Sequence, residues 1–147
     1  MAHIIVIEDN VQSSRMVAKL LRKAGHTVVV SDTGEGGLLA VFESVPDLVL
    51  MDLGLPDIDG QTVIGVIRQQ PTLATMPIIA FTAWPEDTAY SMAAAYNCDG
   101  VITKPIDTRM LVAQVEKFIA TAQIMKSNSP KDNSIPGKTS AIEDVKE

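Results

Sequence analysis

Short apolar runs alternate with amphipathic stretches along most of this 147-residue chain. The runs cover residues 3–7, 27–31, 47–51, 77–81 and 100–102. Four of them are near-continuous and rich in Val and Ile, which is the pattern of strands that are covered on both faces in a parallel sheet. The runs therefore predict five short β-strands.

The stretches between the runs carry apolar residues at helical spacing. Val17, Leu20, Leu21 and Ala24 occur at positions i, i+3, i+4 and i+7, and Gly25 follows them as a helix stop. Four further stripes have similar spacing: Leu38, Phe42 and Val45; Val63, Val66 and Ile67; Ala89, Met92, Ala93 and Tyr96; and Leu111, Val115, Phe118 and Ala122. Each stripe predicts an amphipathic helix.

Five strands that alternate with five helices predict an α/β fold, a doubly wound five-stranded parallel sheet with right-handed crossovers. Asp107 is expected to be the N-cap of the last helix. The domain is expected to cover residues 1–124. Residues 125–147 are polar and are expected to form a disordered tail. Its closing residues 141–147 are interpreted as solvated, with a peptide that docks on a partner as the alternative.

Composition and charge narrow the class of protein. The aromatic fraction is 4%, so the core must be aliphatic. The net charge is -6, and all of the excess falls on residues 1–125, which hold 8 basic and 14 acidic side chains. Direct nucleic-acid binding is not expected, because it requires a basic surface. Cys98, the single cysteine, cannot form an internal disulfide, and neither a signal peptide nor a membrane span is found, so a cytoplasmic protein is expected.

Polar residues follow four of the predicted strands. Glu8 and Asp9 follow the first strand, Asp52 follows the third and Thr82 follows the fourth. Lys104 lies two residues after the fifth. Each residue alone has an ordinary explanation as a helix cap, a turn residue or a surface charge. In a parallel sheet, however, all strands end at one edge, where open α/β sheets bind their ligands. The pattern therefore predicts one polar site.

Three carboxylates at one edge repel one another. A pair of like charges about 4 Å apart costs about 4 kcal/mol at an effective dielectric constant near 20. A bound cation relieves this cost, and an all-oxygen site favours Mg²⁺, with Mn²⁺ as an alternative. A carboxylate can then attack a phosphoryl donor, while the Lys104 ammonium and the Thr82 hydroxyl receive phosphoryl oxygens. The residues thus indicate an aspartyl-phosphate site.

Residues 3–122 resemble the receiver domain of two-component response regulators. The resemblance rests on four segments taken together: 5–10 (IVIEDN), 50–60 (LMDLGLPDIDG), 80–83 (AFTA) and 104–105 (KP). It implies the CheY-like strand order 2-1-3-4-5. It also implies a signalling switch that assists its own phosphoryl transfer, and not an enzyme with a separate substrate.

The resemblance assigns roles to residues of this chain. Asp52 is the expected phosphoacceptor, Asp9 a direct Mg²⁺ ligand, Glu8 a ligand through water, and the Gly54 carbonyl a further ligand. The residues expected to contact the phosphoryl group or to switch with it are Thr82, Ala83 and Lys104. The bond from Lys104 to Pro105 is expected to be cis.

Two positions depart from the family's pattern. Val101 stands where the family usually has an aromatic switch residue, so we expect a different coupling mechanism. Trp84, two residues after Thr82, is a candidate modulator of phosphoryl lifetime, with a structural role at the start of a helix as an equal alternative.

The implied partners are a sensor histidine kinase or a His-containing phosphotransfer protein, and a downstream effector. The protein itself is expected to be a monomer or weak dimer.

Three other functions remain as alternatives. A flavodoxin-like electron carrier is disfavoured because Glu8 and Asp9 would repel a flavin phosphate. An aspartate-nucleophile phosphohydrolase would need an acid at position 54, where Gly54 stands. A degenerate receiver that binds without phosphorylation is disfavoured by the intact acidic set.

Overall fold

The computed structural model describes residues 1–127. Within this range five parallel strands form one sheet in the order β2-β1-β3-β4-β5. The strands are β1 (His3–Ile7), β2 (Thr27–Ser31), β3 (Leu48–Met51), β4 (Ile78–Thr82) and β5 (Gly100–Thr103). Their bounds differ by at most one residue from those predicted, and the predicted fold class and strand order are confirmed.

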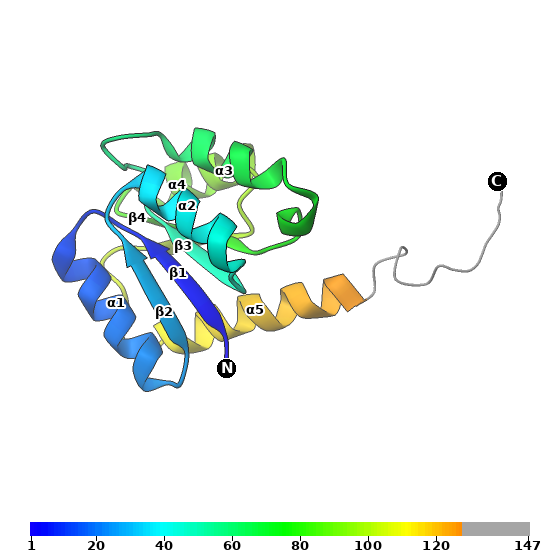
Figure 1. Cartoon of the computed structure of the whole chain (residues 1–147). Helices are drawn as coiled ribbons and strands as arrows, with labels where there is room; N and C mark the ends of the chain where they lie inside the picture. Colours follow the sequence, from blue (N-terminus) through cyan, green and yellow to red (C-terminus); the bar gives the residue numbers. More distant parts are fainter. Residues whose placement is uncertain (128–147) are drawn as a thin grey trace, which may run out of the picture.

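Helices cover both faces of the sheet, as Figure 1 shows. The helices α1 (Val11–Lys23) and α5 (Leu111–Ser127) lie on one face. The helices α2 (Gly34–Ser44), α3 (Gly60–Arg68) and α4 (Glu86–Ala95) lie on the other, with a short 3₁₀ turn η1 (Pro71–Leu73) after α3. Among residues 1–127, none of the helices has both the length and the apolar character needed to cross a bilayer.

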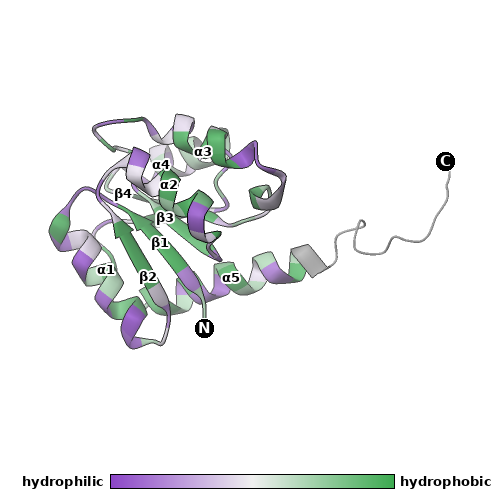
Figure 2. Ribbon diagram, viewed as in Figure 1, coloured by the Kyte–Doolittle hydropathy of each residue, from purple (hydrophilic) through white to green (hydrophobic). Residues whose placement is uncertain are grey.

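The core is mainly aliphatic, with the buried Phe81 as its aromatic member, and the sheet divides it into two layers. Strand β1 shows the division: Ile4 and Val6 pack towards α1 and α5, whereas Ile5 and Ile7 pack towards α2, α3 and α4. All four are fully buried, and Figure 2 shows the central strands as the most hydrophobic part of the chain. The near-continuous apolar runs of the sequence arise because both strand faces are covered.

Helix α1 ends where the sequence predicts. Gly25 has a φ of 101°, in the left-handed region that glycine adopts without a steric cost. Its N–H donates to the Arg22 carbonyl, and the His26 N–H donates to the Leu21 carbonyl. These two bonds form a Schellman motif, which satisfies carbonyls that the helix leaves open at its end.

The start of the last helix differs from the prediction. Helix α5 begins at Leu111, not directly after Asp107. The Asp107 carboxylate accepts from the Arg109 N–H at 3.0 Å, so it caps a turn that precedes the helix. At its other end α5 runs on to Ser127, so residues 125–127 are helical although the sequence placed them in the tail. The rest of the predicted tail, residues 128–147, lies outside the described residues.

Candidate functional site

The polar site lies at the carboxyl edge of the sheet, and backbone hydrogen bonds just beyond the strands hold it there. The Asp52 N–H donates to the Ile7 carbonyl at 2.9 Å, and the Lys104 N–H donates to the Thr82 carbonyl at 2.8 Å. Because these bonds continue the pairing of β1 with β3 and of β4 with β5, the register of the sheet brings the residues together. The site is thus a direct product of strand order and register.

Glu8, Asp9 and Asp52 form an acidic cluster. One carboxylate oxygen from each lies within 4.8 Å of the others. Glu8 is buried, Asp52 is partly buried, and Asp9 is exposed to solvent. The cluster is therefore open on one side and closed at its base.

Lys104 supplies the positive charge that this cluster needs. Its Nζ forms an ion pair with Glu8 Oε1 and lies 3.7 Å from Asp52 Oδ2. The same ammonium lies 4.8 Å from the centre of the Phe81 ring, at a distance that allows a cation–π contact. Lys104 is thus held between two carboxylates and an aromatic face, and its bond to Pro105 is cis.

The Glu8 carboxyl group has an unfavourable environment for its charge. Burial raises the pKa of Glu8, and the nearby Asp52 carboxylate raises it further. The Lys104 ammonium and the Asn10 N–H, which donates to Glu8 Oε2 at 3.0 Å, lower the pKa but only in part. A divalent cation would offset the cost of the charged form, because it attracts all three carboxylates.

The donor set fits a hard cation that prefers oxygen. Each of the three clustered residues offers a carboxylate oxygen, and such ligands suit Mg²⁺ or Mn²⁺ better than softer metals. The Gly54 backbone follows Asp52 in the same loop, and its N–H donates to Asp52 Oδ1 at 2.9 Å. This bond orients the Asp52 carboxylate and leaves Oδ2 on the side of Lys104.

Thr82 is the last residue of β4 and is buried. Its Oγ1 accepts a hydrogen bond from the Trp84 N–H at 3.0 Å. The hydroxyl proton of Thr82 is not used by this bond and can be donated to another oxygen. Ala83 is exposed beside it, and Trp84 is partly buried against the core on the α2–α4 side.

Val101 lies within β5, opposite Ala80 in β4, and belongs to the core on the α2–α4 side. It also lines a groove of about 590 Å³ between α4 and α5, together with Tyr90 and Phe118. Val101 therefore belongs both to the core and to the lining of this groove.

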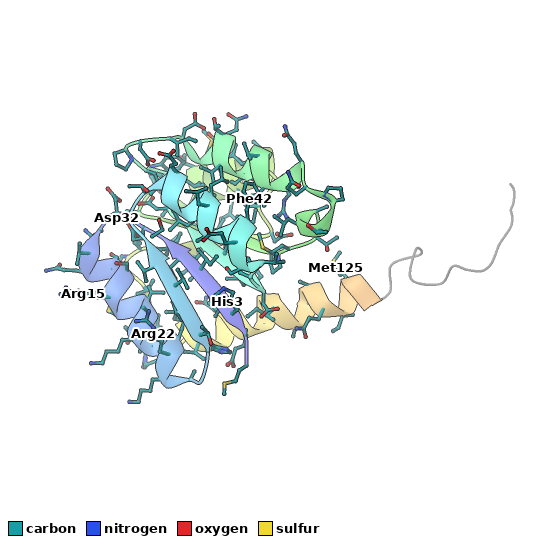
Figure 3. All side chains as sticks on the ribbon, viewed as in Figure 1. His3, Arg15, Arg22, Asp32, Phe42 and Met125 are labelled. Carbon is teal, nitrogen blue, oxygen red and sulfur yellow. The ribbon has the colours of Figure 1, made fainter. Side chains whose placement is uncertain are left out.

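Two features of the site have no clear sequence signal. The first is Phe81, which looks like any core residue of β4 but lies beneath the Lys104 ammonium. The second is Asp57, whose carboxylate accepts from backbone N–H groups more than twenty positions earlier in the chain. Asp32 also follows a strand, and Figure 3 shows it at the carboxyl end of β2, but it does not belong to the acidic cluster.

A family model of the response regulator receiver domain matches residues 4–116. The transcriptional regulatory protein KdpE of Mycobacterium tuberculosis is 33% identical over 119 residues, which are 81% of this chain and 51% of KdpE. The response regulator DivK of Brucella ovis is 25% identical over 119 residues, which are 97% of that protein. The chain therefore spans about half the length of KdpE and nearly all of DivK.

Solved structures show the same architecture. NtrX from Brucella abortus superposes with a TM-score of 0.78 at 25% identity, over 86% of this chain and 29% of NtrX. The chemotaxis response regulator CheY4 of Vibrio cholerae superposes with a TM-score of 0.75 at 21% identity, over 80% of this chain and 98% of CheY4. The second likeness concerns the fold alone.

Proposed function

The chain belongs to the family of response regulator receiver domains, and we propose that it is a switch operated by phosphorylation of Asp52 in the presence of Mg²⁺. The phosphoryl group comes from a sensor histidine kinase or a His-containing phosphotransfer protein. The modified form either binds an effector differently or passes the phosphoryl group along a relay. The protein acts in the cytoplasm as a monomer or weak dimer, without a separate substrate.

The observation that carries the proposal is the placement of Asp52. Its Oδ1 accepts from the Gly54 N–H, and its Oδ2 faces the Lys104 ammonium at 3.7 Å, beside two further carboxylates. One oxygen is thus held in place while the other points to a cation. That arrangement suits a nucleophile that attacks a highly charged group.

In the proposed reaction, an Asp52 oxygen forms a bond to phosphorus, and the bond from phosphorus to the donor breaks with its electron pair leaving on the donor. The bound metal ion would neutralise charge on the carboxylates and on the transferred group. Asp9, Asp52 and the Gly54 carbonyl would hold the ion directly, and Glu8 would hold it through water. Lys104 and Thr82 would contact the other oxygens of the phosphoryl group.

Lys104 and Thr82 are expected to change partners when Asp52 is modified. The Lys104 ammonium lies close enough to Asp52 to turn from Glu8 towards a phosphoryl oxygen. The Thr82 hydroxyl can donate its free proton to a second oxygen while its Oγ1 still accepts from Trp84. Ala83, which is exposed beside Thr82, offers its backbone N–H to the phosphoryl group.

The test is a comparison of masses. Wild type treated with acetyl phosphate and Mg²⁺ should gain one phosphoryl group, and Asp52→Asn should gain none, because an amide cannot form the acyl phosphate. Asp32→Asn, which changes an exposed carboxylate after β2, should behave like wild type. Equal phosphorylation of Asp52→Asn would disprove the assignment. A folded wild type that is never modified would instead favour a binding module that acts without phosphorylation.

A further inference from the structure

The first turn of α2 is capped by the residue directly before it and by a residue from a distant part of the chain. Thr33, directly before the helix, accepts from the Gly36 N–H with Oγ1 and from the Gly37 N–H with its carbonyl, both at 3.0 Å. Asp57 accepts from the Gly34 N–H with Oδ1 at 2.9 Å and from the Glu35 N–H with Oδ2 at 3.2 Å. The bond from Gly37 is the first backbone bond of the helix itself. The open N–H groups of Gly34, Glu35 and Gly36 are therefore shared between Thr33, which adjoins the helix, and Asp57 in the β3–α3 loop.

Steric contact between the loop and α2 accompanies these hydrogen bonds. A Cβ atom added to Gly34 would lie 2.0 Å from Ile58 Cγ2 and 3.4 Å from Leu55 Cδ1. Any residue other than glycine at position 34 would therefore clash with Ile58 and force this part of the contact to shift. The β3–α3 loop, residues 52–59, thus contacts the start of α2 both through hydrogen bonds and through close packing.

The Asp57 carboxylate is exposed, and its hydrogen bonds to α2 stabilise its charged form further. The N–H groups of Gly34 and then Glu35 hold the pKa of Asp57 below its usual value of 3.8. Hydrogen bonds to a charged acceptor are stronger than neutral ones, and the positive end of the α2 dipole also favours an anion there. The contact is thus fully formed at neutral pH.

The same loop carries the phosphoacceptor at its other end. It begins with Asp52 and Gly54, directly after the buried strand β3, and it ends with Asp59, whose carboxylate caps α3. Between these two ends, Asp57 is the polar side chain through which the loop contacts α2. The position of the Gly54 carbonyl therefore depends on how the middle of the loop is held.

We propose that Asp57 is a positioning residue for the phosphoacceptor site, because its contact with α2 holds the β3–α3 loop in the arrangement that metal binding and phosphoryl transfer require. The inference rests on the proposed function of Asp52. Asp57 itself touches neither the metal ion nor the phosphoryl group. Its effect reaches the site through the loop, by keeping the Gly54 carbonyl and the Asp52 carboxylate in place.

The test compares Asp57→Asn with Thr33→Ala. Asp57→Asn keeps the size of the side chain but replaces one acceptor oxygen with a donor, so one bond to α2 is lost. Thr33→Ala removes the local cap of the same helix and leaves the loop contact intact. We expect Asp57→Asn to weaken Mg²⁺ affinity, measured by calorimetry, about 3- to 10-fold and to slow phosphorylation by acetyl phosphate similarly. We expect Thr33→Ala to lower the melting temperature comparably while its Mg²⁺ affinity stays within twofold of wild type.

Gly34→Ala provides a second, independent variant, because its Cβ would clash with Ile58 and is expected to disturb the contact between the loop and α2. It should weaken Mg²⁺ binding as Asp57→Asn does, and the double variant should lose less than the product of the two effects. Wild-type Mg²⁺ affinity in Asp57→Asn would overturn the inference, and so would equal losses in Asp57→Asn and Thr33→Ala. A wild type that neither binds Mg²⁺ nor accepts a phosphoryl group would instead overturn the proposed function, and the inference with it.

Discussion

At the scale of single residues, Lys104 shows how the site tolerates its charges. The ammonium pairs with the buried Glu8 and lies near Asp52, so two negative charges share one positive charge. One ammonium can neutralise only one of these two carboxylates, so one negative charge is left uncompensated. The site therefore favours an added cation, and the lysine is free to change partners when one arrives.

Cys98 provides a residue-scale prediction about reactivity. Burial, and to a smaller extent the Asp99 carboxylate, raise the pKa of the Cys98 thiol to about 11, although the Arg68 guanidinium opposes both effects. Only the thiolate reacts with alkylating reagents, so iodoacetamide should modify the folded protein slowly at pH 8 and faster as the pH approaches 11. The rate should be followed by mass spectrometry.

The matching control is the protein in urea, where the thiol should react with an ordinary pKa near 9.0. Between pH 9 and 11 the unfolded state loses its thiol proton first, so stability should fall as the pH rises through that window. Equal rates for the folded and unfolded protein at pH 8 would contradict this account.

At the scale of elements, two helices end on residues other than glycine that adopt the left-handed region. Val45 follows α2 with a φ of 43°, and Asn97 lies after α4 with a φ of 68°. Asparagine adopts this region readily, whereas a β-branched residue does so at a steric cost. Val45 is more than half exposed, so little packing compensates for that cost.

We therefore expect Val45→Asn to raise the free energy of unfolding by about 1 kcal/mol. The reverse change, Asn97→Val, should lower it by a similar amount, because it introduces the same strain at the end of α4. Both values can be measured by urea unfolding monitored by circular dichroism. A loss of stability in Val45→Asn would show that the Val45 side chain contributes more by packing than its backbone costs.

The coupling between the site and the rest of the molecule also belongs to this scale. Thr82 is tied to Trp84, and α4 begins two residues later at Glu86. Val101 is small and its χ1 angle is restricted, so it cannot make the swing of an aromatic switch residue. We propose that activation moves the β4–α4 loop and the start of α4 instead.

Amide chemical shifts with and without beryllofluoride and Mg²⁺ test this route. Changes should concentrate in residues 54–60 and 82–88 and should be weak around Val101. Asp52→Asn under the same conditions should show no such changes, because it cannot hold the phosphoryl mimic. If Val101→Ala abolished the response of α4 while Asp52 was still modified, Val101 would be the coupling residue.

At the scale of the whole molecule, stability should depend on the cation that the acidic site takes up. Because the pKa of Glu8 is raised above 4.5, the folded state binds its proton more tightly than the unfolded state does. Without a cation, stability should therefore fall as the pH rises above 4.5 towards neutrality. A ligand that binds only the folded state offsets this loss.

Mg²⁺ at 100 times its dissociation constant should thus raise the free energy of unfolding by about 2.7 kcal/mol at neutral pH. Thermal melts with increasing Mg²⁺ measure the effect, and Trp84, the single tryptophan, offers a fluorescence signal near the site. Asp9→Ala should lose most of the response, whereas the exposed Asp32→Asn should keep it. The same response in wild type and Asp9→Ala would count against the acidic site.

The sequence by itself determined the elements and the edge at which the site forms. The period of apolar residues distinguishes strands from helices locally, and a parallel sheet places the ends of its strands together. The five strands were therefore predicted within one residue, and the acids after β1 and β3 were expected at one edge with Thr82 and Lys104. These properties follow from short-range patterns and from a topology that admits few alternatives.

Only the tertiary structure decided which polar groups meet. Lys104 pairs with Glu8 and lies over Phe81, and Asp57 caps a helix that begins 23 positions earlier. Both contacts depend on register and packing, which leave no periodic pattern in the sequence. Arg68 is a further case: its guanidinium donates to the Met76 carbonyl at 2.6 Å and to Asp99 at 2.8 Å, joining the segments before β4 and β5. Such contacts join residues far apart in sequence, so only the folded arrangement specifies them.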